Sequence, residues 1–466
     1  MTDAPSRTSI MAEEGGLPPA QRLAAMTVIA LGLTLSVLDG TIANIALPTI
    51  ARHLHTSAAA SIWVINAYQL TITISLLPLS SLGDRIGYRR VYLCGLLLFT
   101  VASLGCALSD SLTTLALART VQGFGAAGVM SVNMALIRTI FPPSRLGRGV
   151  AVNAMIVAIS SVVGPTLASL ILSIASWQWL FAINVPIGIV AFVRGMRVLP
   201  MNERHPSRYD YVSAVMNALV FGMLIFAVDG FGHGEARRYV AVELLCAFVV
   251  GIFFVRRQLH QSAPLLPVDL LRIPVFTLSV LTSICSFCAA STAFVALPFL
   301  LQNEIGFSQI QTGLLMTPWP LVIVGVAPLA GALSDRYPAG VLGGIGLTTL
   351  AVGLLLLATL GAHPSGFDIG WRMALCGVGF GIFQAPNNRQ MLSSAPRSRA
   401  GGASGMLGTA RLTGQTLGAA LVALIFGISP QHGPVIALYV ASLSAAIAII
   451  VSLSRLVPIP ALKRNK

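Results

Sequence analysis

The stretch SVLDGTIANIALP, residues 36–48, places a carboxylate, Asp39, near the middle of a long apolar run. Leucine, isoleucine, valine and alanine surround it for more than a helical turn on each side. A carboxylate near the centre of a membrane-spanning helix costs about 2.5–3.5 kcal/mol on insertion scales, so ionisable residues found there as a rule have a function. Two questions follow: whether this run crosses a membrane, and what Asp39 does there.

The composition of the whole chain answers the first question. Of its 466 residues, 55% are hydrophobic and 9% are charged, and the mean hydropathy is +0.83. A soluble globular chain has about 25% charged residues. We therefore expect an all-α integral membrane protein.

The cysteines and histidines offer no catalytic or metal site. The six cysteines lie inside apolar runs without metal-ligand spacing, and the seven histidines fall in the polar breaks. We expect no enzyme, no bound metal and no cofactor. Without a histidine in the apolar runs, a proton carried through the membrane would have to use a carboxylate.

The number and orientation of the spans follow from length and charge. A spanning helix needs about 20 mostly apolar residues, and polar breaks divide the chain into fourteen such runs. Most lysines and arginines fall in alternate loops, while the other loops contain only Arg52, Arg237 and Arg238. Because positive charge marks the cytoplasmic side, both termini are expected in the cytoplasm. The net charge of +14 is then a topology signal and not a nucleic-acid patch. The predicted outer ends contain an aromatic belt of Trp63, Trp177, Trp179 and Trp371.

Matching features recur at one common offset in the two halves of the sequence. LGDRIG (82–87) is repeated as LSDRYP (333–338), and the Leu-Pro pair at 47–48 recurs at 297–298. The repeat predicts two six-helix bundles with two inserted central helices, the architecture in which two halves move about a site near the midplane. The predicted divisions are a disordered cytoplasmic leader (1–21), an N-terminal six-helix bundle (22–208), inserted helices (209–258), a cytoplasmic linker (259–273), a C-terminal six-helix bundle (274–457) and a basic cytoplasmic tail (458–466).

Five stretches resemble one known family. They are LDGTIANIALP (38–48), SSLGDRIGYRRVYL (80–93), LALARTVQGFGAA (115–127), SSVVGPTLAS (160–169) and WQWLFAINVPIG (177–188). Together they resemble the major facilitator superfamily, specifically its fourteen-span drug:proton antiporter family of multidrug and quaternary-ammonium exporters. LALARTVQGFGAA (115–127) matches the family pattern in full. SSLGDRIGYRRVYL (80–93) departs from the pattern at Ser80 and Tyr88. SSVVGPTLAS (160–169) has Ser160, Ala168 and Ser169 where the family usually has glycine.

The resemblance implies a secondary active transporter that exports hydrophobic or amphipathic drugs in exchange for protons by alternating access. Its energy source would be the proton motive force, and its partners would be small drug-like molecules, protons and the lipid bilayer. We expect a monomer in the cytoplasmic (inner) membrane of a bacterium. Two alternatives remain open: a proton-coupled exporter of one physiological metabolite, and a receptor or scaffold without transport, which would have little need of Asp39.

Asp39 and Arg119 are the expected proton-coupling residues. A carboxylate in the membrane can be neutral in one state and charged in another. The alternative for Asp39 is a packing hydrogen bond, with Asn44 or Asn66. A buried arginine stays charged and needs a partner. Asp39 could be the switched partner of Arg119, or backbone carbonyls of the first span could hold it permanently.

Conformational gating is assigned, by the resemblance, to the loop after the second span and to the fifth span. The expected gating residues are Asp84, Arg85, Gly87, Arg89, Gly164 and Pro165. An aspartate at a helix end can face the N-terminus of a neighbouring helix and hold one conformation closed. A Gly-Pro pair can kink a helix. The alternatives are simple topology charges and an ordinary membrane-helix kink.

The residues that could line a substrate cavity are more scattered, and each could instead be packing. They are Trp63, Asn66, Tyr68, Trp319, Arg411 and Glu243. For Glu243, snorkelling of the side chain to the outer interface is the alternative. Asp39 is the only deep carboxylate, against arginines at 119, 372 and 411. We therefore expect monovalent cations, neutral molecules or weak anions as substrates, in preference to dications.

Overall fold

The structure, a computed structural model, describes residues 16–201, 209–232, 237–261, 264–361, 363–396 and 399–456. These residues form helices and the connections between them. Most of the predicted leader and the whole predicted basic tail lie outside the described residues.

The helices follow one another in three groups along the chain. The first group is α2 (Pro19–His53), α3 (Ala58–Ser61), α4 (Trp63–Ile86), α5 (Tyr88–Ala107), α6 (Leu112–Ile140), η1 (Pro143–Arg145), α7 (Leu146–Ile174), α8 (Trp179–Ala182) and α9 (Asn184–Val198). Next come α10 (Tyr211–Gly232) and α11 (Arg237–Leu259). The third group is η2 (Val268–Arg272), α12 (Pro274–Phe299), η3 (Leu300–Glu304), α13 (Gln309–Met316), α14 (Pro318–Leu333), α15 (Ala339–Ala358), α16 (Gly366–Ser394), α17 (Ala400–Ile428) and α18 (Gly433–Ser454).

Local sequence explains where several helices begin. At α6, the Ser111 hydroxyl accepts from the Thr114 backbone N–H at 3.2 Å, and the Thr114 hydroxyl accepts from the Ser111 N–H. Ser308 and Gln311 form the same reciprocal pair at α13. Each pair satisfies N–H groups that have no partner inside the helix.

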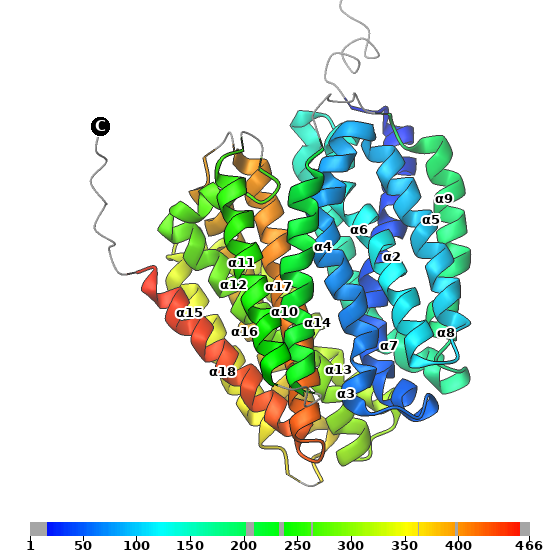
Figure 1. The fold of residues 1–466 in the computed structure, drawn as a ribbon, viewed down its shortest axis with the longest axis vertical. Helices are drawn as coiled ribbons and strands as arrows, with labels where there is room; N and C mark the ends of the chain where they lie inside the picture. Colours follow the sequence, from blue (N-terminus) through cyan, green and yellow to red (C-terminus); the bar gives the residue numbers. More distant parts are fainter. Residues whose placement is uncertain are drawn as a thin grey trace, which may run out of the picture.

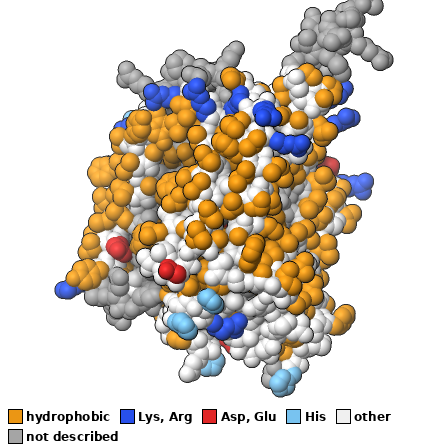
Figure 2. All heavy atoms as spheres, turned by 90° about the vertical axis from the view of Figure 1, so that its right-hand side faces the viewer, with side chains coloured by type: hydrophobic (Ala, Val, Ile, Leu, Met, Phe, Trp, Pro, Cys, Tyr) orange, Lys and Arg blue, Asp and Glu red, His pale blue; other side chains and the backbone are white. Residues whose placement is uncertain are grey.

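Within the described part of the chain, thirteen helices are long and apolar enough to cross a membrane. Helix α16, which contains the predicted twelfth span, is not among them. Its apolar centre is shortened by Asp368 and Arg372 near one end and by polar residues 387–389 near the other. On the face shown in Figure 2, hydrophobic side chains form a broad band, and most of the visible lysines and arginines lie toward the upper end.

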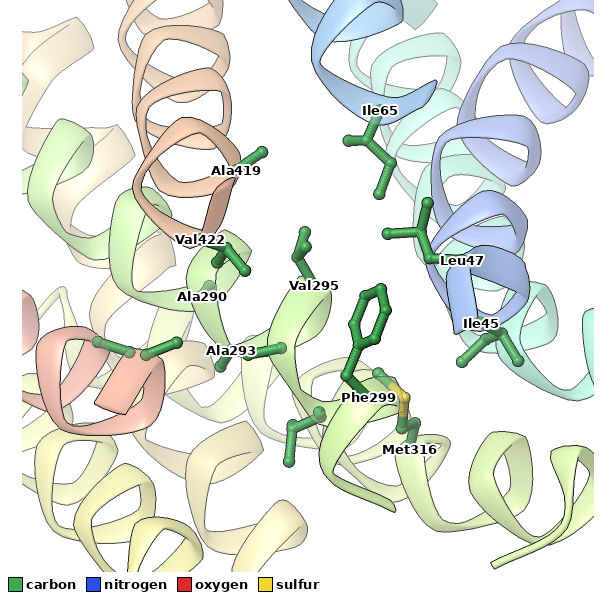
Figure 3. Close-up of a cluster of buried hydrophobic side chains, with 14 of the residues drawn as sticks. Ile45, Leu47, Ile65, Ala290, Ala293, Val295, Phe299, Met316, Ala419 and Val422 are labelled. Carbon is green, nitrogen blue, oxygen red and sulfur yellow. The ribbon is translucent and has the colours of Figure 1, made fainter. Parts of the chain in front are cut away.

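The first and third groups of helices form two bundles that meet at the end opposite the arginine-rich loops (Figure 1). Hydrogen bonds join the bundles there, among them Arg52 to Asn303 at 3.2 Å, Gln302 to the Ile45 carbonyl at 3.1 Å, Gln309 to Thr49 at 2.6 Å and Ser169 to the Gln309 carbonyl at 3.0 Å. Beside them, Ile45, Leu47 and Ile65 face Val295, Phe299 and Met316 across the interface (Figure 3). The space between the bundles is therefore sealed at this end.

Helices α10 and α11 are packed together, and α10 contacts both bundles (Figure 1). Ile225 of α10 packs with Leu70 of α4 and Ala420 of α17. The Asn217 amide donates to the Ile74 carbonyl of α4 at 2.9 Å. Helices α10 and α11 thus lie beside the interface between the two bundles.

Asp210 ties the start of α10 to the end of α11. It accepts from the Ser213 backbone N–H at 3.1 Å and from the Arg257 guanidinium at 3.0 Å, and it also accepts from Gln261. Burial alone would raise the pKa of this carboxyl, but the hydrogen bonds from Gln261, Ser213 and Arg257 outweigh burial and hold its pKa well below the ordinary value. Asp210 is therefore ionised at neutral pH.

Candidate functional site

Asp39 lies inside the N-terminal bundle, where three side chains satisfy its carboxylate. Arg119 forms an ion pair with Oδ2, and both side chains are 1% exposed. The amides of Gln122 and Asn184 each donate to Oδ1 at 2.9 Å. The partners predicted from the sequence as an alternative, Asn44 and Asn66, do not hydrogen bond to Asp39. The carboxylate is paired and closed off from solvent in this conformation.

Arg119 is held on several sides. Its Nε donates to the Val64 carbonyl at 2.9 Å, and its Nη1 donates to Gln122 Oε1 at 2.7 Å as well as to Asp39. The guanidinium carbon lies 4.1 Å from the Tyr68 ring centroid and 5.4 Å from that of Phe181. Such cation–aromatic contacts contribute most when desolvated. Nη2 is buried without a hydrogen-bond partner among the described residues, so one donor remains available to a group that enters the site.

The local fold explains how these groups converge. Gln122 follows Arg119 by three residues on α6 and therefore shares its helix face. Asn184 begins α9, directly after the short helix α8 and Ile183, whose backbone is also helical. The Tyr68 hydroxyl donates to the Ser36 carbonyl of α2 at 2.9 Å, which fixes its ring beside Arg119. Elements α2, α4, α6 and α9 thus all contribute to one buried polar cluster.

The chemistry available to this cluster is the gain or loss of one proton at Asp39. When ionised, the carboxylate neutralises Arg119 and accepts three hydrogen bonds. Protonation would remove the charge that Arg119 faces, and breaking a buried ion pair in this way costs about 3–5 kcal/mol unless the surroundings rearrange. The ion pair and the hydrogen bonds to Asp39 therefore hold α2, α6 and α9 together in this conformation.

The loop predicted to control gating forms a tight turn between α4 and α5. Gly87 has φ +105°, a conformation that L side chains rarely adopt, and its N–H donates to the Gly83 carbonyl at 3.0 Å. Asp84 accepts from the Tyr88 hydroxyl at 2.6 Å. Arg89 donates to the Met196 carbonyl of α9, whereas Arg85 is exposed. Tyr88, which replaces a basic residue of the family pattern, therefore contacts Asp84 directly.

Replacing Gly87 with alanine is expected to destabilise the protein by about 1–3 kcal/mol, because a Cβ is strained at this φ. A lower thermal unfolding temperature in detergent would report the strain. The control is Gly105→Ala within α5, where an added Cβ would meet only ordinary contacts, the nearest atom being Ala118 Cβ at 3.6 Å. Equal unfolding temperatures for the two variants would contradict the prediction.

The Gly164-Pro165 pair of α7 lies between the two bundles. A Cβ on Gly164 would overlap the Thr41 hydroxyl of α2, two residues beyond Asp39. The Ser169 hydroxyl donates to the Pro165 carbonyl at 2.9 Å and to the Gln309 carbonyl, next to α13, at 3.0 Å. The pair therefore connects the helix that contains Asp39 with the opposite bundle, even though Ser169 replaces the glycine of the family pattern.

The residues predicted for a substrate cavity are distributed over several places. Trp63 stacks on Phe226 of α10 with ring centroids 5.2 Å apart, and Trp319 is fully buried 4.8 Å from the ring of Phe294. Asn66 is fully buried, and neither atom of its amide has a partner among the described residues. Tyr68 belongs to the Arg119 cluster.

The surroundings of Glu243, Arg372 and Trp177 complete the set of residues singled out from the sequence. Glu243 of α11 has a buried carboxylate oxygen without a partner in the described part of the chain. Arg372 forms an ion pair with Asp368 one helical turn away, at 2.9 Å. Trp177, predicted to lie in the lipid-facing belt, is instead buried, with its ring edge-on to Phe181. The belt prediction is therefore wrong for Trp177, because the start of α8 turns it inward.

Two of the residues that contact Asp39 were not assigned a role from the sequence. Gln122 and Asn184 both occur inside stretches that resemble the family motifs. Their position inside these motifs was the one available sign of a function. Their contacts with Asp39, however, join residues that are 83 and 145 positions apart in the chain. Hydrophobic periodicity and motif spacing are local patterns and do not predict contacts between residues so far apart.

Comparison with known proteins gives consistent results. The family model described as Major Facilitator Superfamily matches residues 29–419. The chain is 57% identical over 439 residues to the uncharacterized transporter YebQ of Escherichia coli (strain K12), covering 94% of this chain and 96% of YebQ. It is 29% identical to the riboflavin transporter RibZ of Clostridioides difficile (strain 630), covering 88% and 89% of the two chains. It is 32% identical to multidrug resistance protein Stp of Mycobacterium tuberculosis (strain CDC 1551 / Oshkosh), covering 86% and 75%.

Proposed function

This chain belongs to the Major Facilitator Superfamily, and on that premise we propose that it exports hydrophobic or amphipathic compounds in exchange for protons. The observation that supports the proposal most strongly is the sealed cluster of Asp39, Arg119, Gln122 and Asn184. A titratable carboxylate in such a cluster can link proton binding to helix arrangement. The similarity to a protein named for multidrug resistance supports drug-like substrates.

The proposed cycle is alternating access between the two bundles. The conformation described above is sealed at the outer end, so the next step is opening of that seal as the two bundles rock against each other. We place the fourteen spans, including α16 and the inserted pair α10 and α11, in a bacterial inner membrane with both termini in the cytoplasm. The arginine-rich loops support this orientation.

Flux in liposomes that contain the purified protein tests the proposal. Ethidium, a permanent monocation, and taurocholate, a permanent amphipathic anion, are suitable probes because neither gains or loses a proton near neutral pH. We expect a pH gradient to drive at least one of them against its concentration gradient, together with proton flow in the opposite direction. If neither probe moves, or if movement ignores the pH gradient, the proposal fails.

A second candidate, export of one physiological metabolite, is favoured by the similarity to a protein named as a riboflavin transporter. The same liposomes distinguish the two. Riboflavin transport that ethidium and taurocholate do not inhibit would support the narrow substrate. Inhibition by several unrelated amphipathic compounds would support the broad one.

A further inference from the structure

Arg411 of α17 has no charge partner. It forms no hydrogen bond or ion pair with any described residue, and its Nε is buried without a partner. The other two arginines within the predicted spans are paired, Arg119 with Asp39 and Arg372 with Asp368. Because an unpaired arginine deep in a membrane protein is expensive, the side chain of Arg411 needs an explanation.

The packing of α17 shows which way Arg411 faces. On one side, Gly414 and Gly418 lie against α12, where an added Cβ would meet the carbonyls of Ile284 and Cys288. On another side, Leu412 packs with Tyr68 and other residues of the N-terminal bundle, while Thr416 lies 3.0 Å from Thr73 of α4. A turn of about 100° per residue places Arg411 between these two faces, toward the space between the two bundles.

Exposure along this stripe of α17 changes from one end to the other. Ser404, Arg411, Gln415 and Val422 follow one another at spacings that keep them on one side of the helix. Ser404 is exposed, Arg411 and Gln415 are partly exposed, and Val422 is fully buried in the outer seal (Figure 3). The stripe is thus accessible from the cytoplasmic end past Arg411 to the level of Gln415 and is closed at Val422.

The charges nearby leave Arg411 uncompensated. The helices that form the contacts between the two bundles are α2, α3, α4, α7, α12, α13, α14 and α17. Within them, the acidic residues are Asp39 and Asp84. Asp39 is sealed against Arg119, and Asp84 contacts Tyr88 at the cytoplasmic end of α4. The described space between the bundles therefore has a positive side chain without a negative one.

We propose that Arg411 is a substrate-binding residue and that it selects amphipathic organic acids by binding their carboxylate. A guanidinium presents planar paired N–H groups that match a carboxylate with two parallel hydrogen bonds. The substrate then supplies the missing charge, while its apolar part lies against the surrounding helices. The inference rests on the proposed export function and narrows it to a substrate class.

Binding of nalidixate and of its methyl ester tests the inference, because the two probes share their ring system and differ mainly in the carboxylate. Kd values are to be measured by calorimetry on the purified full chain. For the wild type we expect the acid to bind at least about tenfold more tightly than the ester, which is about 1.4 kcal/mol. In Arg411→Gln the two Kd values should become equal, and Arg411→Lys should retain part of the preference. Arg336→Gln, which removes an exposed arginine, is the matched control and should behave like the wild type.

A second measurement separates binding from packing. Because Arg411 has no partner in the described structure, Arg411→Gln should unfold at the same temperature as the wild type or higher. A lower unfolding temperature, or an acid preference that survives in Arg411→Gln, overturns the inference, as does a wild type that does not prefer the acid. Loss of the preference in Arg411→Gln without any proton-driven flux of ethidium or taurocholate in the wild type would overturn the export proposal and leave the Arg411 site standing.

Discussion

Replacing Asp39 with asparagine is expected to abolish proton-driven export, while the protein remains folded but less stable because Arg119 loses its charge partner. Asparagine has nearly the same shape and can still accept the hydrogen bonds that Gln122 and Asn184 donate to Oδ1. It has no carboxylate to bind and release a proton. We expect transport driven by a pH gradient to fall by about 100-fold or more, equivalent to about 2.7 kcal/mol, measured as ethidium or taurocholate flux in liposomes.

Two controls make this result specific. Exchange of labelled for unlabelled substrate without a pH gradient should persist in Asp39→Asn, because exchange needs binding and movement but no net proton transfer. Glu243→Gln removes a second carboxylate from the membrane helices, one whose buried oxygen has no partner among the described residues. This variant should transport like the wild type. Full proton-driven flux in Asp39→Asn, or its loss in Glu243→Gln, would move the coupling site away from Asp39.

Replacing Arg119 with glutamine is expected to be the most destabilising single change in the buried cluster. Asp39 would lose its charge partner while staying 2% exposed, and removal of one member of a buried ion pair costs about 3–5 kcal/mol. The double variant Asp39→Asn with Arg119→Gln should recover most of that loss, because it removes both charges. Unfolding in detergent, followed by circular dichroism, measures all three variants.

Arg372→Gln provides the comparison for this experiment. Arg372 pairs with Asp368 near the start of α16, where the two side chains are 15% and 31% exposed. A partly exposed pair contributes about 0–1 kcal/mol. If Arg119→Gln is no more destabilising than Arg372→Gln, or if the double variant is as unstable as Arg119→Gln alone, the ion pair is not the reason that Arg119 is present.

The central pair could be predicted from the sequence because the physical constraint is strong. A carboxylate and an arginine inside apolar runs each need a partner, which made Asp39 and Arg119 candidate partners alongside Asn44, Asn66 and backbone carbonyls. The structure selects the contact between Asp39 and Arg119. The all-helical class and the positions of most spans can also be predicted, because a spanning helix needs about 20 mostly apolar residues in a row. The assignment of Gly87 to a special turn conformation was also within reach, since glycine between two apolar runs favours such a turn.

The remaining parts of the site depend on tertiary contacts that no local pattern encodes. Asn184 reaches Asp39 because α9 packs against α2, although the two residues are 145 positions apart in the chain. Tyr68 was expected in a substrate cavity, yet its ring lies beside Arg119. The position of α10 against both bundles, and the direction in which Arg411 points, arise from helix packing between segments far apart in the chain.

Proton release on substrate binding is the measurement that tests the central claim most directly. The purified wild type, in weakly buffered detergent solution with a pH-sensitive dye, should release up to about one proton per bound substrate molecule, as linkage between the two ligands requires. Asp39→Asn should bind the same substrate and release none. Equal release by the two proteins would show that Asp39 is not the proton site and would contradict the account.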